Sequence, residues 1–98
     1  MRSDAARISD ILRVLANEHR LLVLCELIDG PKSVTALCAR IPDISQSAMS
    51  QNLSLMKAHG LLDARKSGQT VTYSIEDRRV EEIITVLKKN YCQINEGE

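Results

Sequence analysis

The sequence has no phenylalanine, no tryptophan and only two tyrosines among its 98 residues. A hydrophobic core must therefore be built almost entirely from aliphatic side chains and methionine. Hydrophobic residues still make up 44% of the chain, which is more than disordered chains contain, so we expect a folded protein. Because 98 residues are enough for one domain and too few for two, residues 1–98 are expected to form a single domain.

Features of exported, membrane-bound and catalytic proteins are missing as well. There is no signal peptide and no hydrophobic run near the roughly 18 residues that a membrane-spanning helix needs. Three cysteines without a secretion signal fit a reducing cytoplasm better than a disulfide framework. No Ser/His/Asp grouping, carboxylate pair or phosphate-binding loop stands out. We therefore expect a cytoplasmic protein with no membrane partner, no enzymatic activity and no cofactor.

The formal net charge is zero, which argues against a protein that coats nucleic acid through a large basic excess. The charge is unevenly distributed along the chain, however. Between residues 32 and 66 there are five basic residues and two acidic ones, whereas residues 76–98 contain six acidic residues and four basic ones. The middle of the chain can therefore face phosphate while the C-terminal part faces elsewhere.

Five segments have the hydrophobic spacing of amphipathic helices. We predict these helices, with their caps, at Asp4–Leu15, Asn17–Gly30, Val34–Arg40, Gln46–Ala58 and Asp77–Cys92. Residues that favour helix N-caps precede them, namely Asn17, Ser33, Asp77 and, for the fourth helix, either Asp43 or Ser45. Gly30-Pro31 and Gly60 are suited to end helices, and the tail from Gln93 to Glu98 is expected to fray.

From Leu61 the hydrophobic period changes to two, and it alternates again over Thr70–Ile75. Two short strands around Ser67-Gly68-Gln69 are typical of a β-hairpin. The third and fourth helices, joined by a short turn that contains proline, suit a helix-turn-helix. The predicted fold is mainly α with a β-hairpin wing, a winged helix-turn-helix in the order α-α-α-α-β-β-α.

The fourth predicted helix has two unlike faces. Met49, Leu53 and Met56 recur at helical spacing and should pack inward. The other face carries short uncharged donors and acceptors, which a helix needs to read base edges in the major groove. Cations and an amide near the hairpin tip can reach phosphate or the minor groove. The predicted DNA-binding residues are Gln46, Ser47, Ser50, Gln51, Ser54, Arg65, Lys66 and Gln69. Alternatively, the helix face is only a solvated surface and the tip is charged for solubility.

Three segments resemble the ArsR/SmtB family of bacterial repressors, in the order that the family has them. They read LANEHRLLVLCEL in the second helix, SQSAMSQNLSLMKAHGLL in the recognition helix and ARKSGQTVTYSI in the wing. The resemblance implies a transcriptional regulator that binds operator DNA. Asn52 departs from the pattern, which usually has histidine there; we expect it beside the reading face, where it would alter operator preference.

The resemblance also implies a homodimer paired through the first and last helices. The residues agree with this, because both helices have hydrophobic stripes without an obvious partner. The predicted interface consists of Ile8, Ile11, Leu12, Leu15, Val80, Ile83, Ile84, Leu87 and Tyr91. The alternative is that both stripes close the core of the monomer.

Within that family the chain most resembles the HlyU, BigR and SqrR group of thiol-based regulators. The resemblance places their two switch cysteines at Cys25 and Cys92, where oxidants or reactive sulfur species would form a bridge that weakens DNA binding. Taken alone, Cys25 is more typical of a core residue. Cys92 lies near a helix end with Lys88 and Lys89 one turn earlier, which favours the thiolate. Cys38 is expected only to pack.

Metal-dependent relatives in the family hold their ions with residues that this chain lacks. Of a thiolate site in the third helix only Cys38 matches, since Ser33 and Thr35 occupy the other positions, and Arg79 replaces a zinc-binding histidine in the last helix. One thiol cannot hold a zinc ion, so we expect no metal. A metal-responsive repressor and a winged-helix protein-interaction module remain as alternatives; the polar reading face disfavours the latter.

Overall fold

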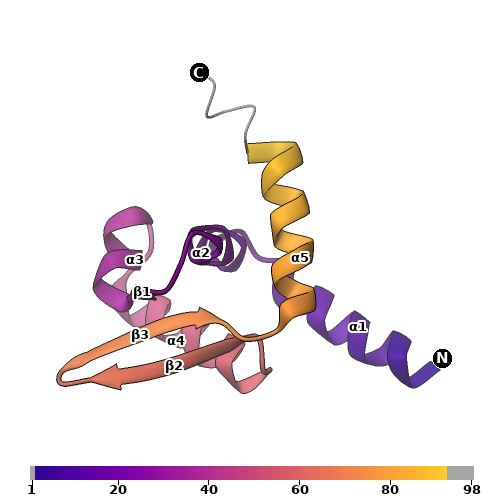
Figure 1. Ribbon diagram of the computed structural model, residues 1–98, viewed down its shortest axis with the longest axis horizontal. Coiled ribbons are helices and arrows are strands. Elements are labelled where there is room, and N and C mark those ends of the chain that lie inside the picture. The colour runs from indigo at the N-terminus through magenta and orange to yellow at the C-terminus, as the bar shows by residue number, and fades with distance from the viewer. Residues whose placement is uncertain (1, 93–98) are drawn as a thin grey trace.

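The computed structural model describes residues 2–92, except for the side chain of Cys92 (Figure 1). Its elements are α1 (Arg2–Leu15), α2 (Glu18–Ile28), β1 (Lys32–Ser33), α3 (Val34–Arg40), α4 (Gln46–Ala58), β2 (Leu62–Ser67), β3 (Thr70–Ile75), α5 (Arg78–Leu87) and a π-helical turn (Lys88–Cys92) that continues α5. The predicted winged helix-turn-helix is therefore confirmed. The wing projects from one side of the molecule, and α1 extends away from the other side beside α5 (Figure 1). None of the helices in residues 2–92 is long and apolar enough to cross a membrane.

Side chains close the N-termini of four helices as the sequence predicts. Asn17, Ser33 and Asp77 each accept hydrogen bonds from backbone N–H groups in the first turn of α2, α3 and α5. For α4 the structure selects between the two candidates, because the Ser45 hydroxyl accepts from the N–H of Ala48. Each cap supplies a partner for an N–H group that the helix itself cannot satisfy.

The sheet has the strand order β1-β3-β2, with both pairs antiparallel. β2 and β3 form the predicted hairpin, closed by the pair Ser67 and Thr70. Gly68 takes the first central position of the turn with φ +62°, a conformation that glycine adopts without steric cost. The two-residue strand β1 pairs with Thr72 and Tyr73 and was not expected from the sequence.

The core is aliphatic, as the absence of large aromatic residues requires. It packs side chains from every helix against the base of the hairpin. The buried residues are Val14, Leu15, Val23, Leu24, Leu27, Leu37, Ile41, Met49, Leu53, Met56, Leu61, Leu62, Val80 and Ile84.

The end of α4 is fixed to the start of the wing. Gly60 has φ +77°, and its N–H donates to the carbonyl of Lys57. The next N–H, of Leu61, donates to the carbonyl of Met56 at 2.9 Å. These two bonds form a Schellman motif, which satisfies the last carbonyls of the helix. Because Leu61 is also fully buried, the direction of β2 is set relative to α4.

Candidate nucleic-acid interface and thiol site

The two faces of α4 lie as the sequence predicts. Met49, Leu53 and Met56 have no exposed surface, so they anchor the helix on the core. The polar residues predicted to read DNA are all exposed, namely Gln46, Ser47, Ser50, Gln51 and Ser54. The structure therefore presents a row of amides and hydroxyls to the outside, on a helix that cannot roll without exposing its hydrophobic side.

A polar groove of about 260 Å³ lies between α3, α4 and the wing. It brings together three residues that the sequence analysis selected, Gln46, Ser50 and Gln69. It also adds Ser33, Thr35 and Thr70, which the sequence analysis did not select for DNA contact. These hydroxyls come from three separate segments, so only the folded arrangement of β1, α3 and β3 could identify them. Hydroxyl and amide groups at such a place can donate hydrogen bonds to phosphate oxygens.

The wing presents its cations at the exposed end of the hairpin. Arg65, Lys66 and Gln69 are all exposed. Arg65 donates to the carboxylate of Asp63 at 3.1 Å, which holds its guanidinium close to β2. Lys66 makes no ion pair within residues 2–91, so its ammonium group can reach an anionic partner.

Asn52 lies at the flank of the exposed polar face of α4, as expected. Its side chain is half-buried, and its Oδ1 accepts a hydrogen bond from Nε of Arg20 in α2 at 3.1 Å. The amide oxygen of Asn52 is therefore turned toward α2, at the edge of the exposed polar face. An effect of Asn52 on operator preference stays a prediction.

The predicted dimer residues divide into two groups. Leu15, Val80 and Ile84 are at most 5% exposed and belong to the core of the protomer. Because they are buried within the core cluster of the protomer, they cannot also form a surface, and their assignment to an interface is corrected. Ile11 is half-buried. The remaining predicted residues are exposed: Ile8 (55%), Leu12 (52%), Ile83, Leu87 and Tyr91 (71%).

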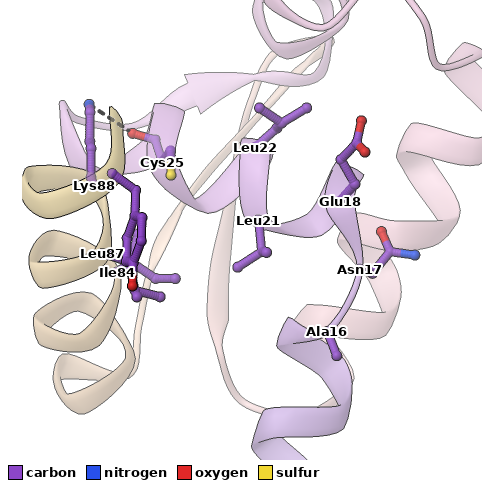
Figure 2. A pocket seen from close by; sticks show the side chains of 10 residues that line it. Ala16, Asn17, Glu18, Leu21, Leu22, Cys25, Ile84, Leu87 and Lys88 are labelled. Carbon is purple, nitrogen blue, oxygen red and sulfur yellow. Dashed lines mark hydrogen bonds between the residues drawn. The ribbon is translucent and has the colours of Figure 1, made fainter. Parts of the chain in front are cut away.

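Cys25 lines an apolar pocket of about 560 Å³ between α2 and α5 (Figure 2). Its side chain is half-buried and packs against the core. Leu21 and Leu22 line the pocket from α2, and Leu87 and Tyr91 line it from α5 and the turn that follows. The Cys25 side chain therefore lies in a pocket between α2 and the end of α5, which are the two parts of the chain that contain the predicted switch cysteines.

Lys88 ties the same two elements together at the edge of this pocket. Its ammonium group donates to the carbonyl of Cys25 at 3.2 Å and to the carboxylate of Asp29 at 3.1 Å. The hydrogen bond and positive charge of Lys88 hold the pKa of Asp29 below its usual value. The thiol of Cys92 lies outside the part of the chain that the structure describes. Cys38 is half-buried and packs against the core, which agrees with a packing role.

Within residues 2–91, no three His, Cys, Asp or Glu side chains come together in a way that could hold a metal ion. His19 pairs with Asp43 across Nε2 and Oδ2 at 3.0 Å, and His59 contacts the carbonyl of Leu55. Both histidines therefore have protein partners.

Comparisons with known proteins find helix-turn-helix transcriptional regulators. A family model described as HxlR-like helix-turn-helix matches residues 14–96. The transcriptional activator HlyU of Vibrio cholerae is 40% identical over 98% of this chain and 88% of its own. A solved structure of HlyU from V. cholerae N16961 has a TM-score of 0.89 at 39% identity, over 94% of this chain and 99% of that one.

Two further relatives extend the agreement. The HTH-type transcriptional regulator YgaV of Escherichia coli is 35% identical over 94% of this chain and 93% of its own. The crystal structure of the transcriptional repressor BigR from Xylella fastidiosa has a TM-score of 0.83 at 25% identity, over 95% of this chain and 91% of that one. These relatives confirm the predicted resemblance to HlyU and BigR. They also confirm the expectation that the chain is not an enzyme. The assignment to the ArsR/SmtB family stays a prediction.

Proposed function

Since the chain belongs to the HxlR-like helix-turn-helix family, we propose that it is a cytoplasmic transcriptional regulator that binds operator DNA as a homodimer. We further propose that the oxidation or persulfidation of Cys25 and Cys92 controls its affinity for the operator. The relatives HlyU, YgaV and BigR, which are described as transcriptional regulators, support the first of these statements. The second rests on the chain's own cysteines.

The exposed polar face of α4 is the observation that carries the proposal of DNA binding. Its amides and hydroxyls lie next to the polar groove and the wing. A recognition helix in the major groove reads base edges with side chains of this kind, and glutamine can pair with adenine through two hydrogen bonds. The groove then takes the sugar-phosphate backbone, and Lys66 at the wing contacts phosphate.

The exposed hydrophobic surface of α1 and α5 supports a homodimer. Ile8, Leu12 and Ile83 are exposed on helices that no other element of residues 2–92 covers there. A second copy with the same surface would bury it through a two-fold axis. Such a dimer would place two α4 helices about 34 Å apart, in successive major grooves.

The proposed switch joins α2 to the end of α5. Cys92 reacts first, because it lies near a helix end with the exposed Lys89 one turn before it, and Cys25 then displaces the group added to Cys92. Bridge formation removes two protons and two electrons from the thiols, which the oxidant or polysulfide accepts. The link moves the last helix within the dimer surface and so changes the spacing of the two reading helices.

The experiment begins with a duplex selected by the wild-type protein from a random-sequence library. Fluorescence anisotropy then compares reduced, peroxide-treated, polysulfide-treated and zinc-loaded protein on this duplex. We expect tight binding by reduced protein and weaker binding after peroxide or polysulfide. Failure to enrich any duplex would contradict DNA binding and favour a protein-interaction module, and release by zinc alone would favour a metal-responsive repressor.

A further inference from the structure

Arg20, in the first turn of α2, connects the end of α1 to the middle of α4. One guanidinium nitrogen donates to the backbone carbonyl of Val14 at 3.0 Å. Nε of the same side chain donates to Oδ1 of Asn52 at 3.1 Å. All three groups are part-buried, so water competes weakly for these bonds.

The carbonyl of Val14 needs this partner. The carbonyl of Val14 belongs to the last turn of α1, where no later N–H of the helix can reach it. The guanidinium is planar, and its donors point in fixed directions, so two bonds from one side chain also fix the angle between their acceptors. Lysine, with a single nitrogen on a flexible stem, cannot hold both positions in the same way.

Asn52 occupies the part of α4 where such a bond controls rotation. It follows Gln51 of the exposed polar face and precedes Leu53 of the buried face. Successive residues of a helix are about 100° apart around its axis, because a turn takes 3.6 residues. A bond at this flank therefore resists rolling of α4 over its hydrophobic stripe, and rolling would redirect Gln51.

The neighbouring residue in α2 holds the segment that leads into α4. His19 and Asp43 pair through Nε2 and Oδ2 at 3.0 Å, and the hydrogen bond from His19 holds the pKa of Asp43 below its usual value. Two consecutive side chains of one turn thus contact the helix-turn-helix at two points. The backbone of that turn is fixed in its own right, because Oδ1 of Asn17 accepts from the N–H of Arg20 at 3.1 Å.

We propose that Arg20 is a positioning residue for DNA recognition, which sets the rotation of α4 through Asn52 and links it to the end of α1. The inference rests on the proposed function, in which α4 reads DNA and α1 belongs to the dimer surface. A displacement at the end of α1 then reaches α4 directly through one guanidinium. Asn52 affects sequence preference through this bond and makes no contact with a base.

The test measures the ratio of affinities for the selected duplex and for a scrambled duplex of the same composition. Asn52→Leu removes the hydrogen-bond acceptor at similar side-chain size, and Asn52→Asp keeps an acceptor. Arg20→Lys keeps the positive charge but loses the planar group that donates two bonds. We expect the ratio to fall about tenfold in Asn52→Leu and Arg20→Lys, the loss typical of one hydrogen bond to a charged group. In Asn52→Asp the ratio should stay within about twofold of the wild-type value, since a uniform charge effect cancels in it. Arg13→Lys and Asn90→Leu, in exposed parts of α1 and of the turn after α5, are matched controls and should keep the ratio.

The double variant of Arg20→Lys and Asn52→Leu separates a shared role from two independent ones. If the two residues act through their mutual bond, the affinity ratio of the double variant should fall no further than that of the single variant with the lower ratio. Fully additive losses would overturn the proposal. So would an unchanged ratio in Asn52→Leu, or equal losses on both duplexes accompanied by a lower melting temperature, which is the result expected of a purely structural bond.

Failure of the proposed function gives a different result from failure of this inference. If the wild-type protein prefers no duplex, DNA reading by α4 is wrong, and the role of Arg20 falls with it. If the wild-type protein discriminates and Asn52→Leu discriminates equally well, only the role of Arg20 is wrong. Should Arg20→Lys fail to fold, Asn52→Leu and its control still decide the outcome.

Discussion

The two sides of the molecule use amphipathic helices in opposite ways. α4 hides its hydrophobic side chains in the core and presents amides and hydroxyls to the outside. α1 and α5 also contribute to the core, but they leave Ile8, Leu12 and Ile83 exposed. The helix α4, which carries the polar residues, lies beside the wing, whereas α1, which carries exposed hydrophobic residues, projects from the other side (Figure 1).

The comparison shows how one short chain can serve two partners of different chemistry. A hydrophobic surface on a small protein is suited to another protein surface, whereas hydrogen-bonding groups beside a groove suit the edges of bases and phosphate. The two surfaces share a core but no side chains. A substitution on one should therefore leave the chemistry of the other intact.

The largest effect is expected from Ile83→Asp, which puts a charge on the hydrophobic surface of α5. Ile83 is exposed in the protomer, so the variant should fold but fail to dimerise. Operator affinity should fall on the order of 100- to 10,000-fold, because simultaneous binding of two sites is lost. Sedimentation equilibrium gives the mass in solution. Thr85→Asp, exposed on another face of α5, is the control; an unchanged dimer in Ile83→Asp would show that the surface lies elsewhere.

Oxidation should have the next largest effect. A bridge formed between Cys25 and Cys92, on the side of α1 and α5, should change how α4 binds DNA on the other side. Peroxide or polysulfide should weaken operator binding by about 5- to 150-fold. Cys25→Ser and Cys92→Ser should each bind DNA and ignore the treatment, while Cys38→Ser behaves as wild type. Mass spectrometry should find a link between Cys25 and Cys92. Unaltered affinity after complete oxidation would rule out the switch.

Gln51→Ala should affect reading without affecting assembly. The loss should be about 1–3 kcal/mol on the selected duplex, with relaxed preference at one base pair, as expected for a lost base contact. Anisotropy with single-base variants of the duplex measures both. Asn90→Ala removes an exposed amide far along the chain from α4 and should change nothing; a uniform loss on all sequences would mean that Gln51 contacts phosphate instead.

Lys66→Ala should give a smaller loss that is equal for all sequences. A lysine at the wing that contacts phosphate displaces one counterion, so its removal should lower the slope of log affinity against log salt by about 1. Titrations at several salt concentrations measure that slope. Lys89→Ala, an exposed lysine after α5, should leave it unchanged. A sequence-dependent loss in Lys66→Ala would assign the wing to base reading.

The smallest effect concerns the ion pair between Asp29 and Lys88 at the edge of the pocket. Because Lys88 lowers the pKa of Asp29 from 3.8, the pair stabilises the fold above that pH. The contribution is lost as the pH falls through the lowered value. Asp29→Asn should therefore be slightly less stable than wild type at pH 7 and equal to it at strongly acidic pH. Urea unfolding across that range tests this, with Glu76→Gln, at an exposed position between β3 and α5, as the control.

Local patterns in the sequence were enough to predict most of the fold. The α4 helix shows why, since its cap at Ser45, its buried stripe and the glycine after its end are all encoded within a few residues of one another. The hairpin is equally local, because Gly68 and the alternation on both sides define it. In contrast, β1 has two residues, too few to show a period, and exists only through pairing with β3.

Contacts between distant segments could not be predicted in the same way. Asn52 is 32 residues from Arg20, and nothing in the sequence around Asn52 shows that its amide faces α2. The hydrophobic stripe of α5 was likewise predicted correctly as a stripe, yet Ile84 faces the core and Ile83 faces outward. Periodicity identifies a hydrophobic face, but only the docking of α5 on α2 determines which part of that face is covered.

The positions of the two tyrosines have a practical consequence. The chain has no tryptophan, so its ultraviolet emission comes from tyrosine alone. Tyr91 lines the pocket beside Cys25, and Tyr73 lies in β3 at the centre of the sheet. Each side of the molecule therefore carries one native fluorophore. With Tyr73→Phe, emission reports only events at the pocket and the hydrophobic surface; with Tyr91→Phe, it reports only events at the sheet and the wing, with no dye attached.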